Sequence, residues 1–174
     1  ESSEVIVNSK FMKNDLQRLF GLPYEKINVI PNGVNTTSYT GVDKDYDFRR
    51  QYASDNEKII LYLGRLVYEK GVQNLISAMP KILDKYNDAK LVIAGKGGMI
   101  DELRNQVNYM GIQNKVYFTG YLDSESVKKR YKCADVAVFP STYEPFGIVA
   151  LEGMLAGVPT VVSDIAGLDE IIEH

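Results

Sequence analysis

Five short apolar runs, spaced at regular intervals, constrain the fold of this sequence more than any other feature. The runs are IILYL (59–63), LVIA (91–94), VYFT (116–119), VAVF (136–139) and TVV (160–162). Nearly continuous apolar runs rich in β-branched residues are typical of strands buried on both faces. Their first residues, 59, 91, 116, 136 and 160, are 32, 25, 20 and 24 positions apart, a spacing typical of βαβ units. We therefore expect an α/β fold, a parallel sheet with helices on both faces.

Amphipathic segments fill the intervals between these runs. Apolar residues recur at helical spacing from 72 to 86, which predicts a helix with a local kink at Pro80. Three further helices are expected over about residues 99–110, 124–132 and 147–156.

The first 57 residues are less regular. They predict a strand at EVIVN (4–8), a helix that Ser9 caps and that ends before Pro23, and a short strand at INVI (27–30). The polar stretch from 35 to 57 is interpreted as a surface excursion that precedes the core.

Composition narrows the possible partners and compartments. The 174 residues suit one domain, with 20 Lys and Arg against 23 Asp and Glu. The net charge of −3 argues against non-specific nucleic-acid binding, and no apolar run approaches a membrane span. The single cysteine, Cys133, cannot form an internal disulfide. This fits the cytoplasm, although a disulfide-free secreted domain fits nearly as well.

Ligands of open α/β sheets bind beyond the carboxyl ends of the strands. After the first core run comes GRLVYEKG (64–71), in which Arg65 and Lys70 lie near the start of a predicted helix. A bound phosphate would make two cations favourable there, because helix N–H groups and basic side chains bind anions together. The alternative is a solvated loop in which Glu69 neutralises Lys70.

A glycine-rich turn, AGKGG (94–98), follows the second run. A dinucleotide-binding fingerprint would require its third glycine at position 100, where Ile100 stands, so NAD binding is not expected. A close backbone approach to some ligand, or a tight turn, remains.

The segment STYEPFGIVALEGM (141–154) carries two acids. Pro145 suits an early helical position, which would put Glu144 at the mouth of a helix and Glu152 two turns inside it. Along one continuous helix the two would be about 12 Å apart, too far for a glycosidase carboxylate pair. We expect them to bind different parts of one extended ligand.

Glu152 lies among apolar helix neighbours, where an unpaired carboxylate is costly. It must be exposed, paired with an Arg or Lys, or bound to ligand hydroxyls. Tyr121, after the third run, either stacks on a base or packs within the protein.

Together these segments resemble the retaining, nucleotide-sugar-dependent glycosyltransferases of the GT-B fold, the group of glycogen, starch and sucrose synthases and many mannosyltransferases. The matching stretches are PNGVN, GRLVYEKG, LVIAGKG, FTGY and PSTYEPFGIVALEGMLAGVPTVVS, with a Glu-x7-Glu pair inside the last. The resemblance implies a Rossmann-like fold, the C-terminal half of a GT-B enzyme.

The resemblance also implies roles for individual residues. Arg65 and Lys70 correspond to the pair that neutralises the donor diphosphate. Glu144 corresponds to the acid that holds the donor sugar, and Glu152 to the acid that binds the ribose hydroxyls. Tyr121 matches the position that contacts the nucleobase.

Backbone groups and one turn residue complete the implied site. Phe146 and Gly147 would present N–H groups to the sugar, and Ile148 and Val149 would present theirs to the phosphates. Asn32 matches a turn residue that faces the reaction centre.

The implied reaction is transfer of a hexosyl group, of the glucosyl, glycogen-synthase kind, to a glycan or other hydroxyl acceptor. No metal and no cofactor besides the donor substrate are implied. Alternatives are a mannosyl- or galactosyltransferase of polysaccharide or glycolipid synthesis, a sugar-nucleotide epimerase, and a non-catalytic nucleotide-binding module.

The resemblance implies a division of the chain as well. Residues 1–22 would be a remnant of the interdomain or N-terminal region, and residues 23–174 a donor-binding domain truncated at its C-terminal end. Such a fragment is expected to bind nucleotide without transferring sugar, because its partner would be the enzyme's own N-terminal domain. One departure from the family pattern is Ala166-Gly167-Leu168, where many members carry Gly-Gly-Leu.

Overall fold

The main sheet contains the five predicted strands, all parallel, in the order β5-β4-β3-β6-β7. The structure is a computed structural model that describes residues 3–172, so both chain ends lie outside the described residues. The strands are β3 (Lys58–Leu63), β4 (Ala89–Ala94), β5 (Val116–Gly120), β6 (Val136–Phe139) and β7 (Thr160–Val162). The predicted parallel sheet is confirmed.

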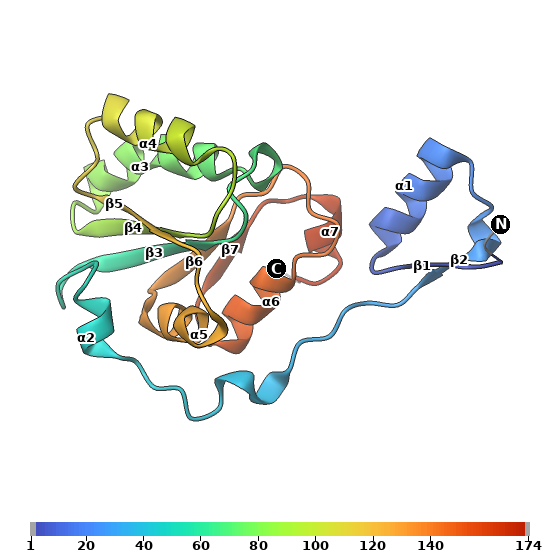
Figure 1. Cartoon of the computed structure of the whole chain (residues 1–174), viewed down its shortest axis with the longest axis horizontal. Coiled ribbons are helices and arrows are strands. Elements are labelled where there is room, and N and C mark those ends of the chain that lie inside the picture. The colour runs from blue at the N-terminus through green and yellow to red at the C-terminus, as the bar shows by residue number, and fades with distance from the viewer. Residues whose placement is uncertain (1–2, 173–174) are drawn as a thin grey trace.

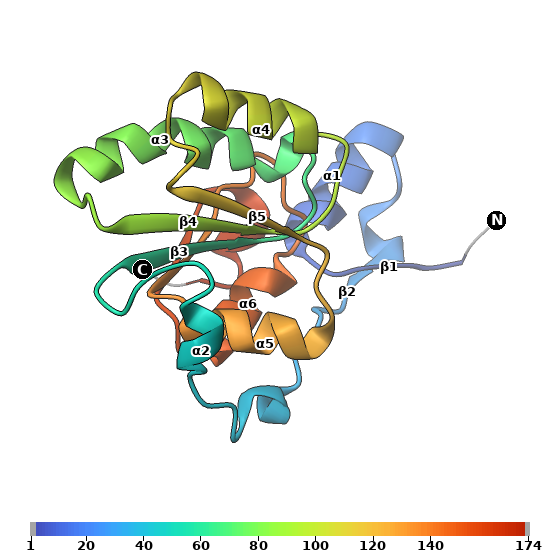
Figure 2. The same cartoon turned by 60° about the vertical axis from the view of Figure 1, so that its left-hand side comes forward.

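Helices cover both faces of this sheet (Figures 1 and 2). One face carries α3 (Val72–Lys85), which continues through Pro80, and α4 (Ile100–Tyr109). The other face carries α5 (Ser124–Cys133) and α6 (Ile148–Leu155), with the short α7 (Ala166–Asp169) near α6. Because side chains alternate along a strand, Ile60 of β3 packs on the first layer and Leu61 on the second.

An N-terminal unit stands beside the main body (Figure 1). In it, β1 (Val5–Val7) pairs in parallel with β2 (Ile27–Val29), and α1 (Lys10–Phe20) connects them. The Ser9 hydroxyl accepts a hydrogen bond from the Met12 N–H at 3.1 Å, which confirms the predicted helix cap. A short 3-10 helix, Tyr24–Lys26, precedes β2.

The segment from 35 to 57 is more than the surface excursion that its polarity predicts. It contains a 3-10 helix, Thr36–Tyr39, and the short α2 (Tyr46–Arg49). Tyr39 and Ala53 are buried in the core layer beneath α5 and α6. The prediction was wrong here because scattered buried residues in a polar segment leave no periodic pattern.

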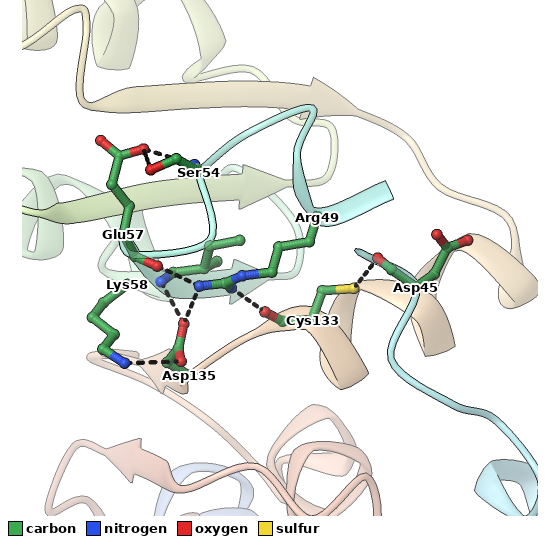
Figure 3. Close-up of polar contacts among 8 residues, drawn as sticks. Asp45, Arg49, Ser54, Glu57, Lys58, Cys133 and Asp135 are labelled. Atoms are coloured by element: carbon green, nitrogen blue, oxygen red, sulfur yellow. Dashed lines mark hydrogen bonds and ion pairs between the residues drawn. The ribbon is translucent and has the colours of Figure 1, made fainter. Parts of the chain in front are cut away.

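Arg49 anchors this segment to the amino ends of two central strands (Figure 3). Its guanidinium donates to the Cys133 carbonyl at 2.6 Å and to the Glu57 carbonyl, and lies 3.0 Å from the Asp135 carboxylate. Asp135 also accepts from the Ile59 N–H at 2.8 Å. The side chain of Arg49 is only 3% exposed, so its charge is buried. Its N–H groups bind the end of the segment before β3 and the junction between α5 and β6.

The strand order has a reversal that locates a crevice. From β3 the chain proceeds outward through β4 and β5, then returns to place β6 on the other side of β3. In open α/β sheets a crevice forms at such a reversal, beyond the carboxyl ends of the two strands. A ligand-binding site is therefore expected at the loops after β3 and β6.

Candidate active site

The loops after β3 and β6 are bound directly to each other. The first runs from Gly64 to Gly71 and contains a 3-10 helix, Tyr68–Lys70, just before α3. The Glu69 carbonyl accepts hydrogen bonds from the N–H groups of Thr142 at 2.8 Å and Tyr143 at 3.3 Å. These backbone bonds fix the β3 loop against the segment that carries Glu144.

Lys70 and Glu144 form an ion pair across this junction. The Lys70 ammonium donates to Oε2 of Glu144 at 2.6 Å, and the Ser141 hydroxyl donates to the same oxygen at 3.3 Å. The side chains of Lys70 and Glu144 are only 17% and 10% exposed. Neutralisation of Lys70 by Glu69, the alternative from sequence, is wrong, because Glu69 lies 3.8 Å from Arg65 instead.

Helix α6 (Ile148–Leu155) lies within one residue of its predicted bounds, but Pro145 does not occupy an early position in it. Gly147 has φ of 95°, a conformation that favours glycine, and the helix starts at Ile148. Pro145 therefore lies before the helix, and Glu144 is not on it. The premise that both acids lie on one continuous helix is therefore wrong, since only Glu152 is helical.

A cavity of about 430 Å³ lies at the junction of the two loops and the start of α6. It brings together eight of the predicted site residues, namely Asn32, Arg65, Lys70, Glu144, Phe146, Gly147, Ile148 and Val149. Two basic residues, one acidic residue and the first residues of a helix thus line one space. Such a set can bind a polyanion that also carries hydroxyl groups.

Two further hollows adjoin this cavity. One of about 480 Å³ contains Glu152, and another of about 290 Å³ contains Tyr121 and Lys96. Leu63, the last residue of β3, lines all three. The sequence-predicted residues that the main cavity lacks, Glu152 and Tyr121, are thus in neighbouring hollows around the same strand end.

Glu152 has no hydrogen bond or ion pair through its carboxylate among the residues that the structure describes. Burial raises its pKa above the ordinary glutamate value. Lys128 lines the same hollow but pairs with Glu125 at 2.7 Å. The pKa of the nearby Tyr39 is raised to about 12, mainly by burial and to a smaller extent by the negative charge of Glu152. Of the alternatives from sequence, pairing with an Arg or Lys is therefore wrong.

Glu152→Gln should stabilise the ligand-free domain at neutral pH. A raised pKa in the folded state means that folding disfavours the ionised carboxylate, so stability is lost as pH rises through that pKa. The glutamine variant avoids this loss, and we expect its Tm at pH 7 to rise by about 2 °C. Below pH 4, where the carboxylate is protonated, the difference should vanish. A lower Tm at pH 7 would mean that the charge has an unrecognised partner.

Gly95 and Gly97, in the turn after β4, pack against the protein's own backbone. A Cβ at Gly97 would lie 2.1 Å from the Leu66 carbonyl oxygen, and the Leu66 N–H donates to the Lys96 carbonyl at 2.8 Å. The sequence left open a close approach to a ligand or a tight turn, and the backbone that approaches these glycines is that of the β3 loop. These glycines hold the loop that carries Arg65 in place.

Tyr121 is well exposed, at 69%, beside a basic side chain. The Lys96 ammonium lies 5.0 Å from the centroid of its ring. The ring is thus free to stack on a planar ligand, and internal packing does not account for its position.

Sequence reasoning missed two residues near the cavity. Asn8 lines it, and Ser141 is buried and bound to Glu144. Asn8 directly follows β1, so the rule that pointed to Arg65 after β3 applies to it equally. Ser141 lies in the segment that the same rule singled out after β6, but its hydrogen bond to Glu144 is created only by the folded loop.

The described part of the chain contains no group of three or more His, Cys, Asp or Glu side chains suited to holding a metal ion. Within residues 3–172, no helix is both long and apolar enough to cross a membrane.

Comparisons with known proteins identify the family. Residues 43–174 match the family described as "Glycosyl transferases group 1", and residues 1–38 match "Glycosyltransferase Family 4". The chain belongs to the glycosyl transferases group 1 family, and its sheet with helices on both sides is that of the Rossmann-like C-terminal half of a GT-B glycosyltransferase.

Individual relatives support this assignment. The chain is 49% identical to an uncharacterised glycosyltransferase of Methanocaldococcus jannaschii, over all of this chain and 45% of that protein. It is 38% identical to the glycogen synthase of Mycobacterium tuberculosis, over 99% of this chain and 40% of that protein. The Anabaena protein HepE, solved in complex with UDP and glucose, superposes with a TM-score of 0.87 at 27% identity, covering 99% of this chain and 47% of that one. The chain therefore spans less than half the length of these relatives.

Proposed function

We propose that the protein transfers a hexosyl group from a nucleoside diphosphate sugar to a hydroxyl acceptor, with retention of anomeric configuration. The observation that carries the proposal is the convergence of Arg65, Lys70 and the start of α6 on one cavity that also contains Glu144. Cations and helix N–H groups suit a diphosphate, and a carboxylate suits sugar hydroxyls.

In this proposal the donor lies across the three hollows. The diphosphate binds Arg65, Lys70 and the N–H groups of Ile148 and Val149. The base lies against Tyr121, and the ionised Glu152 accepts hydrogen bonds from the two ribose hydroxyls. The ribose hydroxyls would supply hydrogen bonds to the Glu152 carboxylate, which has no such partner within the described chain.

The sugar occupies the main cavity. Glu144 and the N–H groups of Phe146 and Gly147 hold its hydroxyls, and Asn32 faces it from the segment after β2. The bond between the anomeric carbon and the diphosphate breaks as the acceptor oxygen bonds to the same face of that carbon. The acceptor proton passes to the leaving diphosphate, whose charge Arg65 and Lys70 stabilise. We propose no metal for this step, because these two side chains supply the positive charge.

The ion pair between Lys70 and Glu144 gives this site a second property. Before the donor binds, each charge compensates the other, so neither is buried alone. The donor then brings an anion to Lys70 and hydroxyl groups to Glu144. The pair thus holds two ligand-binding groups at the positions in which the ligand needs them.

We propose glucose as the sugar and UDP as the nucleotide. The glycogen synthase relative and the HepE complex with UDP and glucose support this choice. Mannosyl or galactosyl transfer, a sugar-nucleotide epimerase and a non-catalytic binding module are the competing functions. We further propose residues 23–174 as the donor-binding domain and residues 1–22 as part of the interdomain region. We also propose a cytoplasmic location, with which the single cysteine is consistent.

Two measurements test the proposal. Calorimetry compares the binding of UDP, ADP and GDP to the protein. Product analysis then uses, as the labelled donor, the glucose ester of the nucleotide that binds most tightly. We expect UDP to bind and the full-length enzyme to form a glycoside that retains the configuration of the donor. Formation of an epimer, binding without turnover, or binding of none of the three nucleotides would contradict it.

A further inference from the structure

Asn8 is a cavity residue to which the proposed function gives no role. It follows β1 directly and lines the same 430 Å³ cavity as Lys70 and Glu144. Its side-chain oxygen is buried and has no hydrogen-bond partner in the described part of the chain. A buried amide oxygen without a donor is costly, so this atom suits a ligand that supplies one.

The position of Asn8 is complementary to the rest of the cavity. Strands β1 and β2 are parallel, with Val7 opposite Val29, so Asn8 and the segment with Asn32 both follow carboxyl ends of this small sheet. Both residues line the cavity, together with the loops of the main sheet. An asparagine offers one acceptor and two donors, which suits the hydroxyl groups of a sugar better than a phosphate.

Glu170 fixes the segment that carries Asn8. Its two carboxylate oxygens accept hydrogen bonds from the Lys10 N–H at 2.9 Å and the Phe11 N–H at 2.7 Å. These are first-turn N–H groups of α1, which have no partner within the helix and favour a negative charge. Ser9 binds the next N–H, that of Met12.

A ring contact joins the same two regions. The ring of Phe11 packs edge-on against the ring of Tyr143, with 5.7 Å between the ring centroids. Tyr143 directly precedes Glu144 in the chain. In Figure 1 α1 lies next to α7, whose end precedes Glu170 directly. The start of α1 is thus held both by a carboxylate after α7 and by the loop that carries Glu144.

We propose that Asn8 hydrogen-bonds a hydroxyl of the bound sugar, and that Glu170 is the positioning residue that holds Asn8 in the cavity by binding the start of α1. This inference rests on the proposed function for the ligand, a nucleoside diphosphate sugar. It adds to that function a contact from the N-terminal unit to the sugar.

The first experiment compares Asn8→Ala with the control Asn14→Ala, an exposed asparagine on α1. Calorimetry measures the affinities of UDP, ADP and GDP and of the glucose ester of each. We compare the nucleotide that binds with its own glucose ester. Asn8→Ala should lower the affinity for the ester about tenfold, or ~1.4 kcal/mol, and should change the affinity for the free nucleotide less than about twofold. Equal effects on both ligands, or no effect on either, would overturn the role of Asn8.

The second experiment examines Glu170→Gln, with Glu102→Gln in the first turn of α4 as the control. Hydrogen exchange of the Lys10 and Phe11 amides should accelerate about tenfold in Glu170→Gln and in neither Asn8→Ala nor the control. Glu170→Gln should also lower the affinity for the glucose ester more than that for the free nucleotide, as is expected of Asn8→Ala. Faster exchange with unchanged ester binding would overturn the positioning role and leave Glu170 as a helix cap.

The two tests separate this inference from the proposed function. If none of the nucleotides or esters binds the unsubstituted protein, the proposed function fails and the role of Asn8 fails with it. The exchange rates still decide whether Glu170 holds α1. If the nucleotides and esters bind but Asn8→Ala has no effect, the inference alone is overturned.

Discussion

Lys70→Ala should lower kcat/KM for sugar transfer by about 10²- to 10³-fold, the loss typical when one preorganised group that stabilises developing charge is removed. Lys70 lies beside the leaving diphosphate in the proposed complex, and its side chain is only 17% exposed, so water replaces it poorly. Steady-state kinetics of the full-length enzyme measure the effect. Lys81→Ala, an exposed lysine on α3, is the matched control and should retain normal turnover.

The same substitution also affects stability, and a second variant separates the two effects. Without Lys70, the Glu144 carboxylate stays buried with only the Ser141 hydroxyl as its partner, which should cost about 3 kcal/mol of the unfolding free energy. The double variant Lys70→Met with Glu144→Gln removes both charges and should recover most of that stability while remaining inactive. Near-normal turnover in Lys70→Ala would refute its assigned role.

Arg49→Ala should lower the free energy of unfolding by about 3–5 kcal/mol. The substitution leaves Asp135 without its guanidinium partner and leaves the Cys133 and Glu57 carbonyls without their donor. It also loosens the segment that places Tyr39 in the core. Urea unfolding at equilibrium measures the change.

Its control is the neighbouring Arg50, whose pairs with Asp47 and Asp55 are exposed. Arg50→Ala should change the stability little, because exposed ion pairs contribute little. Since Arg49 lies at the amino ends of the strands, away from the cavity, nucleotide affinity should persist wherever the Arg49 variant is folded. Equal stability of the Arg49 and Arg50 variants would show that the buried network does not anchor the segment.

The main sheet was predictable because its strands are buried on both faces. A run such as 59–63 is too short for a buried helix and contains β-branched residues, which favours a strand, and regular spacing of such runs then implies parallel order. The site loops were located by the same rule, since they follow strands. In contrast, Pro145 was wrongly placed at the beginning of α6, because the left-handed conformation of Gly147 lets the helix start only after it.

Pairings between distant residues could not be predicted. Lys70 has a carboxylate next to it in sequence, Glu69, yet it pairs with Glu144, 74 positions away. Arg49 looks like one charge in a polar stretch, although its partner Cys133 is 84 positions away. Local sequence contains no record of such pairs, because the topology of the sheet creates them.

A crystal structure of the protein with UDP-glucose tests the central claim most directly. We predict the diphosphate between Arg65, Lys70 and the first N–H groups of α6, the ribose hydroxyls on Glu152, and the glucose beside Glu144. The ion pair between Lys70 and Glu144 should be replaced by contacts of each residue with the ligand. A nucleotide bound away from the carboxyl ends of β3 and β6, or one whose phosphates contact neither Arg65 nor Lys70, would contradict the proposed function.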